Sequence, residues 1–101
     1  MLDYERNGDA LVLRLKGDLD HGAAEAIRVE VDALLADRSV HRLVLDLKEL
    51  QFMDSSGVGF VIGRYKQLAK RGGSVCVTGA DARMDRIFQM SGLYEIVGSR
   101  R

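Results

Sequence analysis

Residues 43–70 read LVLDLKELQFMDSSGVGFVIGRYKQLAK, and this stretch decides the fold. It opens on the apolar run Leu43-Val44-Leu45, whose charged flanks predict a strand buried on both faces. A longer connection, residues 47–53, then leads to Asp54-Ser55-Ser56, where residue types that cap helix N-termini are concentrated. A helix is expected from there to Lys70. A strand followed by a helix is the building unit of α/β domains.

Upstream of this stretch, the pattern predicts a hairpin and a helix. Residues 2–6 are expected to form a short strand, and Asn7-Gly8 is a strong hairpin turn signal because both residues tolerate positive φ. A second strand over residues 10–16 has leucines at alternate positions. After a loop over residues 17–22, the apolar residues from Ala23 onward recur with a period of about 3.6, which predicts an amphipathic helix.

Downstream, the alternation of strands and helices continues. Gly72-Gly73 is expected to end the long helix, and Val75-Cys76-Val77 reads as a third buried strand. Asp81 can cap a helix that runs through Met90, with Gly92 just beyond its end. Residues 94–97 are predicted to form a final short strand. The side chains expected to turn inward from the last helix are Ile87, Phe88, and residues 90–93.

The order of these elements predicts one α/β domain over residues 1–101. Strands that alternate with helices imply crossover connections and parallel neighbours. The expected architecture is a mixed, mostly parallel sheet with an N-terminal antiparallel hairpin and about three helices.

Composition and charge narrow the class of protein. Fifteen basic and fifteen acidic side chains cancel, so no net charge draws the chain to nucleic acid or to an anionic membrane. The single Cys76 excludes an internal disulfide and favours a reducing compartment. The start of the chain has no signal-peptide pattern, and the longest apolar stretch, residues 58–63, is far too short to span a bilayer. We expect a cytoplasmic protein that binds neither nucleic acid nor membrane.

Acidic and hydroxyl side chains gather at one predicted edge of the sheet. Loops that leave the carboxyl ends of parallel strands meet on one edge, where binding sites form. These loops carry Asp18, Asp20, Asp54 and Asp81 together with Ser55 and Ser56. Taken singly, Asp54 and Asp81 read as helix caps. Together, these residues form the best candidate site that the residues alone supply.

Motifs for catalysis are not matched. A Gly-x-Ser-x-Gly elbow needs glycine two residues before the serine, but Met53 and Asp54 stand before Ser55 and Ser56. A triad with His21 or His41 is open in principle, but nothing in the sequence links either histidine to Ser55. One cysteine and two separated histidines give no support for a metal site. The sequence therefore predicts a protein that is not an enzyme and has no cofactor of its own.

Three further groups of residues are expected to be structural. Gly57, Gly59 and Gly63 miss the dinucleotide fingerprint by one residue and are expected to let the helix pack closely on the sheet. Cys76 is expected in the core. The basic residues expected on a solvated helix face are Arg64, Lys66, Lys70 and Arg71.

A phosphate on Ser55 would be tolerated locally. It adds about −1.5 to −2 charges, and the free N–H groups and the dipole at a helix N-terminus accommodate an anion. Phosphorylation would therefore change any surface docked over this helix end without unfolding the domain. The residues alone favour a simpler alternative over phosphorylation, in which Ser55 and Ser56 act only as helix-start residues.

Four segments of the sequence form a recognisable set of motifs. They are Gly17-Asp18-Leu19-Asp20-His21, Phe52-Met53-Asp54-Ser55-Ser56-Gly57-Val58-Gly59, Gly63-Arg64-Tyr65-Lys66 and Met90-Ser91-Gly92-Leu93. These segments resemble the anti-sigma factor antagonists with the STAS fold, and the match runs in register along essentially the whole chain. Residues 63–66 (Gly-Arg-Tyr-Lys) and 19–21 (Leu-Asp-His) are most similar to the sporulation branch of that family.

The resemblance implies a partner switch. The unphosphorylated protein would bind an anti-sigma factor that is also a serine kinase and so release the sigma factor. The kinase would use its own ATP to phosphorylate Ser55, which blocks binding, and a serine phosphatase would restore the unphosphorylated form. Ser56 would be a helix-start residue and not the acceptor. The partner-binding residues implied are Asp18, Asp20, His21, Asp54, Ser56 and Gly57.

Two departures and one alternative accompany this interpretation. The family often has Glu at the position of Asp18. The shorter Asp18 side chain reduces the reach of any ion pair formed there. Members commonly continue past the last strand into a further helix, whereas this sequence ends at Arg101. If that helix has been removed, some apolar surface near Ile96-Val97 is expected to be exposed. The alternative is a scaffold of the same fold, or an antagonist in a general stress-response pathway.

Overall fold

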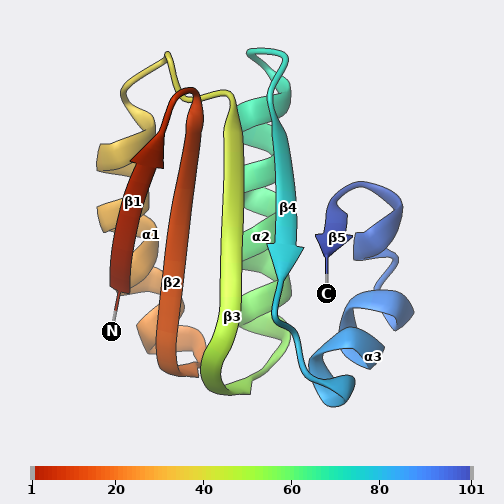
Figure 1. The fold of residues 1–101 in the computed structure, drawn as a ribbon. Coiled ribbons are helices and arrows are strands. Elements are labelled where there is room, and N and C mark those ends of the chain that lie inside the picture. The colour runs from red at the N-terminus through yellow and green to blue at the C-terminus, as the bar shows by residue number, and fades with distance from the viewer. Residues whose placement is uncertain (1, 101) are drawn as a thin grey trace.

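The computed structural model describes residues 2–100 and contains one five-stranded sheet (Figure 1). The strands lie in the order β1-β2-β3-β4-β5, with β1 antiparallel to β2 and every other pair parallel. The predicted fold class is thereby confirmed. The elements are β1 (Leu2–Asn7), β2 (Ala10–Leu19), α1 (His21–Leu35), β3 (Arg42–Met53), α2 (Ser55–Ala69), β4 (Ser74–Thr78), α3 (Ala82–Met90), the 3-10 helix η1 (Leu93–Glu95) and β5 (Gly98–Arg100).

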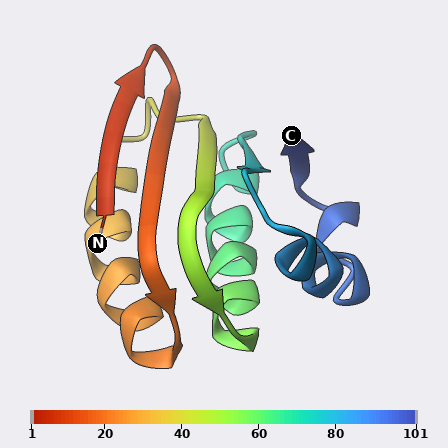
Figure 2. The same ribbon diagram turned by 60° about the horizontal axis from the view of Figure 1, so that its bottom comes forward.

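Helices α1 and α2 cover one face of the sheet and leave the other face open (Figures 1 and 2). Apolar residues alternate along β2 and β3 so that their leucines face the helices. The largest side chains that are almost fully enclosed are Phe88, Leu13, Leu15, Leu19, Leu35, Leu43, Leu45, Leu47, Leu68 and Leu93. This core fixes the positions of both helix N-termini relative to the sheet.

The open face explains two wrong predictions. Val44 on β3 and Cys76 on β4 are only half-buried, because their side chains alternate away from the helices. The central strands are therefore not buried on both faces, and Cys76 is not a core residue. On β1 and β2 the open face carries ion pairs, Arg14 Nη2 to Glu5 Oε1 at 2.9 Å and Lys16 Nζ to Asp3 Oδ2 at 3.0 Å.

Strand β3 runs through the segment that the sequence predicted to be a connection. Its register against β2 shifts twice, between Arg14 and Lys16 and again between Gly17 and Asp18 of β2, and each shift places one extra residue on β3. Such bulges break the alternation that identifies a strand. The Asp46 carboxylate accepts from the Lys48 N–H at 3.0 Å within the first bulge.

Strand β2 is also longer than predicted, because it continues to Leu19 where a loop was expected. Gly17, at φ +81°, adopts a backbone conformation within the strand that other residues rarely take. The helix that follows begins at His21 and not at Ala23, since Asp20 accepts the N–H of Ala23 and caps it. The hairpin loop is Gly8-Asp9, one residue later than predicted.

The C-terminal region differs most from the prediction. Residues 93–95 form a 3-10 helix, and the last strand begins only at Gly98. Met90 is 81 % exposed, so it does not turn inward, whereas Phe88 and Leu93 are enclosed. Gly92 has φ +78°, as expected just beyond a helix end. Ile96 is exposed and Val97 is buried, so only the first of these two residues matches the predicted apolar surface.

Candidate functional site

Two strand–helix junctions, each one residue long, form the candidate site. Leu19 at the end of β2 pairs in register with Met53 at the end of β3, so the next residues, Asp20 and Asp54, lie at the same edge of the sheet. Each of these residues caps the helix that follows. Asp20 Oδ1 accepts from the Ala23 N–H at 2.9 Å, and Asp54 Oδ1 accepts from the Ser56 N–H at 2.8 Å. The predicted edge is thus present in the structure.

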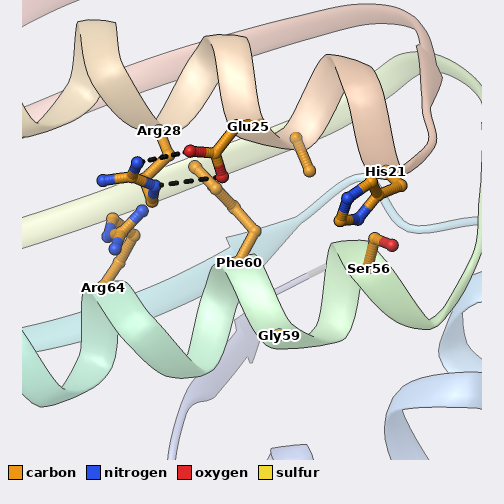
Figure 3. A pocket seen from close by; sticks show the side chains of 8 residues that line it. His21, Glu25, Arg28, Ser56, Gly59, Phe60 and Arg64 are labelled. Atoms are coloured by element: carbon orange, nitrogen blue, oxygen red, sulfur yellow. Dashed lines mark hydrogen bonds and ion pairs between the residues drawn. The ribbon is translucent and has the colours of Figure 1, made fainter.

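The two serines of the motif have different environments. Ser55 is the first residue of α2 and is exposed. Ser56 is half-buried, and its side chain lies opposite the imidazole of His21, the first residue of α1 (Figure 3). An approaching protein can therefore reach Ser55 directly, whereas Ser56 faces the space between the two helices.

Gly57 has a packing role that the other two motif glycines lack. A Cβ at Gly57 would lie 2.3 Å from Met53 Cγ and 3.2 Å from Leu19 Cδ2. The prediction of close helix–sheet packing is therefore confirmed at Gly57. A Cβ at Gly59 or Gly63 would meet nothing within 4 Å, so the prediction is wrong at these two positions.

The acidic side chains at this edge are free of ion pairs among residues 2–100. Asp18 on β2 and Asp20 are exposed, and Asp54 is half-buried. None of the three forms a salt bridge with another residue in the described part of the chain. Asp81 caps α3 by accepting from the Met84 N–H at 2.8 Å. The first three carboxylates are available to basic groups of a partner.

One cation at this edge was missed by the sequence analysis. The Arg83 guanidinium on α3 lies over the Phe52 ring, 5.3 Å from its centroid, and this contact ties α3 to the end of β3. No local pattern in the sequence indicates this contact, because it joins two elements that are far apart in the chain.

A pocket of about 210 Å³ lies between α1 and α2 and extends from their N-terminal ends to Arg28 and Arg64 (Figure 3). Arg64 forms part of its wall and is 6 % exposed, so the prediction of a solvated basic face is wrong at this residue. The signal was its spacing, because Arg64 follows Val61 by three residues and precedes Leu68 by four. The pocket is lined by His21, Ala24, Glu25, Arg28, Ser56, Gly59, Phe60 and Arg64.

The other basic residues of this region divide into two groups. Lys66 and Lys70 are exposed, as predicted. Arg71 instead donates to three backbone carbonyls, those of Leu35 at 2.7 Å, Asp37 at 3.1 Å and Val40 at 3.3 Å. It thereby satisfies acceptors at the C-terminal end of α1 and in the turn beyond it.

No helix in residues 2–100 is both long enough and apolar enough to cross a membrane. Within the same range, no group of three or more histidine, cysteine or acidic side chains could hold a metal ion.

The fold and the Asp-Ser-Ser-Gly junction define the class of this protein. The family model described as the STAS domain matches residues 1–100. The chain therefore belongs to the STAS domain family.

Relatives place the chain within that family. An anti-sigma F factor antagonist of Paenibacillus polymyxa is 38 % identical over 96 residues, which cover 95 % of this chain and 82 % of the relative. The structure of the unphosphorylated anti-sigma factor antagonist SpoIIAA aligns with a TM-score of 0.82 and 29 % identity, covering all of this chain and 88 % of that one. The structure of the phosphorylated form of the Bacillus cell fate determinant SpoIIAA aligns with a TM-score of 0.79 and 32 % identity, covering 100 % and 92 %. The chain thus groups with the anti-sigma factor antagonists.

Proposed function

We propose that this protein is a cytoplasmic, non-enzymatic anti-sigma factor antagonist that is switched off by phosphorylation at Ser55. In its unphosphorylated state it binds an anti-sigma factor that is also a serine kinase, and the bound sigma factor is released. The observation that carries the proposal is the exposed Ser55 hydroxyl at the first position of α2, next to carboxylates without ion-pair partners among the described residues. A relative of 32 % identity exists in a phosphorylated form, which supports the same modification here.

The acidic edge would provide the attraction between the two proteins. Asp18 and Asp20 are exposed and Asp54 is half-buried, and none of the three has an ion-pair partner among the described residues, so a basic surface on the kinase would complement them. His21 and Ser56 border the same contact area, and Gly57 keeps α2 close to β3 so that Ser55 is held at a fixed position. The kinase supplies the ATP, and this chain contributes only the acceptor hydroxyl and the docking surface.

The transfer itself involves the Ser55 side chain alone. Ser55 Oγ forms the new bond to the γ-phosphorus, the bond between that phosphorus and the bridging oxygen of ATP breaks, and ADP leaves. The hydroxyl proton passes to a base of the kinase. The phosphate adds about −1.5 to −2 charges at the N-terminus of α2, where backbone N–H groups and the helix dipole stabilise an anion.

The switch would therefore act at the interface. Phosphorylation adds charge and volume where the partner docks, so the complex dissociates although the domain stays folded. A serine phosphatase that removes the group restores binding.

Single substitutions at the two serines test this proposal. Ser55→Ala is expected to abolish phosphorylation by the cognate kinase and to preserve binding, measured by intact-protein mass spectrometry and by calorimetry. Ser55→Asp is expected to weaken binding with little change in thermal stability. Ser56→Ala is the matched control and should still be phosphorylated. A phosphate mapped to Ser56, or a Ser55→Asp protein that binds unchanged, overturns the assignment.

The identity of the released sigma factor distinguishes the proposed function from its alternatives, which are a general stress-response antagonist and a scaffold of the same fold. Transcription assays with the sigma factor encoded beside the cognate kinase gene should show release by the unphosphorylated protein. Release of a stress-response sigma factor would place the chain in a general stress pathway, and assembly without any release would indicate a scaffold.

A further inference from the structure

A buried and incompletely paired arginine forms one wall of the pocket between α1 and α2. The Arg64 side chain is 8 % exposed, and its nearest carboxylate oxygen, Asp32 Oδ1, lies 3.8 Å from Nη2. That distance is too long for a hydrogen bond. Neither Nε nor Nη1 has a hydrogen-bond partner among residues 2–100. A buried guanidinium in this state is costly unless an acceptor comes from elsewhere.

The neighbouring acidic side chains are already engaged by a second arginine. Arg28 donates to Glu25 through Nη2 and Nε, and to Asp32 Oδ2 through Nη1 at 3.0 Å. Figure 3 shows the Arg28–Glu25 pair above Arg64 at one end of the pocket. Glu25 is therefore directed at Arg28, whereas Asp32 is shared: Oδ2 accepts from Arg28, and Oδ1, which has no hydrogen-bond partner among residues 2–100, lies nearest Arg64. The Arg64 guanidinium also lies over the Phe60 ring, 5.1 Å from its centroid. The charge of Arg64 is thus offset in part, without a hydrogen-bonded counter-charge.

The remaining walls suit a small polar ligand. The Ser56 hydroxyl and the His21 imidazole stand at the other end of the pocket, and both can donate hydrogen bonds (Figure 3). The absence of a side chain at Gly59 keeps the middle of the pocket open, since a Cβ there would meet nothing within 4 Å. The volume, about 210 Å³, far exceeds the roughly 10–15 Å³ that a single water needs.

We propose that this pocket is a binding site for a small oxyanion that carries a phosphate or carboxylate group. The anion would compensate the buried charge of Arg64 and accept hydrogen bonds from Ser56 and His21. Burial also lowers the pKa of Arg64, as expected for a cation that lacks a full counter-charge. The site is separate from the exposed Ser55 hydroxyl, and it does not depend on the proposed switch.

An NMR titration of the full chain tests the site directly. The probes are inorganic phosphate and malonate, added at constant pH and ionic strength, with chloride as the reference anion. We expect saturable shifts of the Ser56, Gly59 and Phe60 amides and of the Arg64 Nε–H. Shifts that grow linearly without saturation for both probes, or that equal those caused by chloride, would overturn the proposal.

Two variants assign the binding to this pocket. Arg64→Gln removes the buried charge and is expected to weaken binding about tenfold or more, as for the loss of a charge-assisted hydrogen bond. Gly59→Leu fills the pocket, and it should fold because the added Cβ has space and leucine favours a helix. Lys66→Gln is the matched control, since it removes one exposed positive charge from the same helix. Unchanged affinity in Gly59→Leu contradicts the assignment even if Arg64→Gln fails to fold.

A third variant tests whether the Glu25 carboxylate, which is paired with Arg28, competes with the added anions. Glu25→Gln removes the carboxylate that occupies Arg28, so it is expected to strengthen binding of the same anions. Weaker binding in this variant would contradict a site that attracts the ligand by its positive charge.

Discussion

Gly57 and Gly59 lie two residues apart on α2, but they meet different surroundings. Gly57 is enclosed by Met53 and Leu19 at the end of the two central strands. Gly59 borders the open pocket between the helices. The same residue type therefore serves close packing at one position and open space at the other.

Alanine substitutions at these two glycines should change stability in opposite directions. Gly57→Ala is expected to lower the free energy of unfolding by about 1–3 kcal/mol, because its Cβ would overlap the Met53 side chain. Gly59→Ala is expected to raise it by about 0.5–1 kcal/mol, since alanine favours a helix interior and the site has room. Urea unfolding of both variants measures the difference. Two variants of equal stability would show that Gly57 has no packing role.

Asp37 predicts a dependence of stability on acid pH. The Ser39 hydroxyl, the Ser39 N–H and Arg6 lower the pKa of Asp37 from its usual 3.8 to about 2. A carboxylate with a lowered pKa contributes its stabilisation fully above its unfolded-state pKa and loses it as the pH falls through the folded-state value.

The Asp37→Asn variant isolates this contribution. Asparagine keeps an acceptor for Ser39 but cannot be charged. The stability difference between the wild type and the variant should be constant above the usual value of 3.8 and should shrink as the pH falls towards about 2. Thermal unfolding over this range measures it. A difference that does not change with pH would mean that the charge of Asp37 contributes nothing.

At the scale of elements, the first turn of α2 depends on the Asp54 cap. Asp54 Oδ1 accepts from the Ser56 N–H, which would otherwise lack a partner within the helix. Asp54→Ala is expected to lower the free energy of unfolding by about 1 kcal/mol, whereas Asp54→Asn keeps the acceptor and should cost much less. Urea unfolding of the two variants compares them. If both lose the same stability, the negative charge matters and the cap hydrogen bond does not.

The elements show what the sequence could predict and what it could not. The order of strands and helices, the α2 boundary and the Asp81 cap follow from local patterns, because periodicity and capping depend on neighbouring residues. The sequence predicts a β3 that is too short, because two bulges interrupt the alternation of its side chains. A bulge depends on the register with the partner strand, which local sequence does not give. The prediction that Arg64 lies on a solvated face is wrong because it rests on the charge of the side chain. The spacing of Arg64 from its apolar neighbours places it on the buried side of α2.

The candidate site shows the same division. The edge that carries Asp20, Asp54 and Ser55 was predictable, because parallel strands end at a common edge. The pocket beside it was not, since it depends on the distance between two helices that are far apart in sequence. The choice of Ser55 over Ser56 came from a family resemblance, and the greater exposure of Ser55 agrees with that choice.

At the scale of the whole molecule, the last strand is the weakest part of the sheet. Strand β5 pairs with β4 over three register positions, whereas β2 and β3 pair over nine. It is the edge strand beside β4, and α3 and η1 lie next to it (Figure 1). Such regions open more easily than a central core.

Amide hydrogen exchange should reveal this gradient. Amides of β5 are expected to exchange before those of residues 43–47 on β3, because β5 is joined to the sheet over only three register positions. Exchange measured by NMR on the native protein tests this order. A single common rate for both groups would indicate that the sheet opens only as a unit.

The single residue between β3 and α2 has a consequence for how an enzyme can reach Ser55. A junction of one residue has no slack, so the serine cannot be drawn out as an extended segment unless the first turn of α2 unwinds and the Asp54 hydrogen bond breaks. An enzyme that modifies Ser55 in the native protein must therefore recognise a three-dimensional shape and not a linear motif. A synthetic peptide with the sequence of residues 50–60 lacks that shape. The enzyme should therefore modify the peptide much less efficiently than the folded domain.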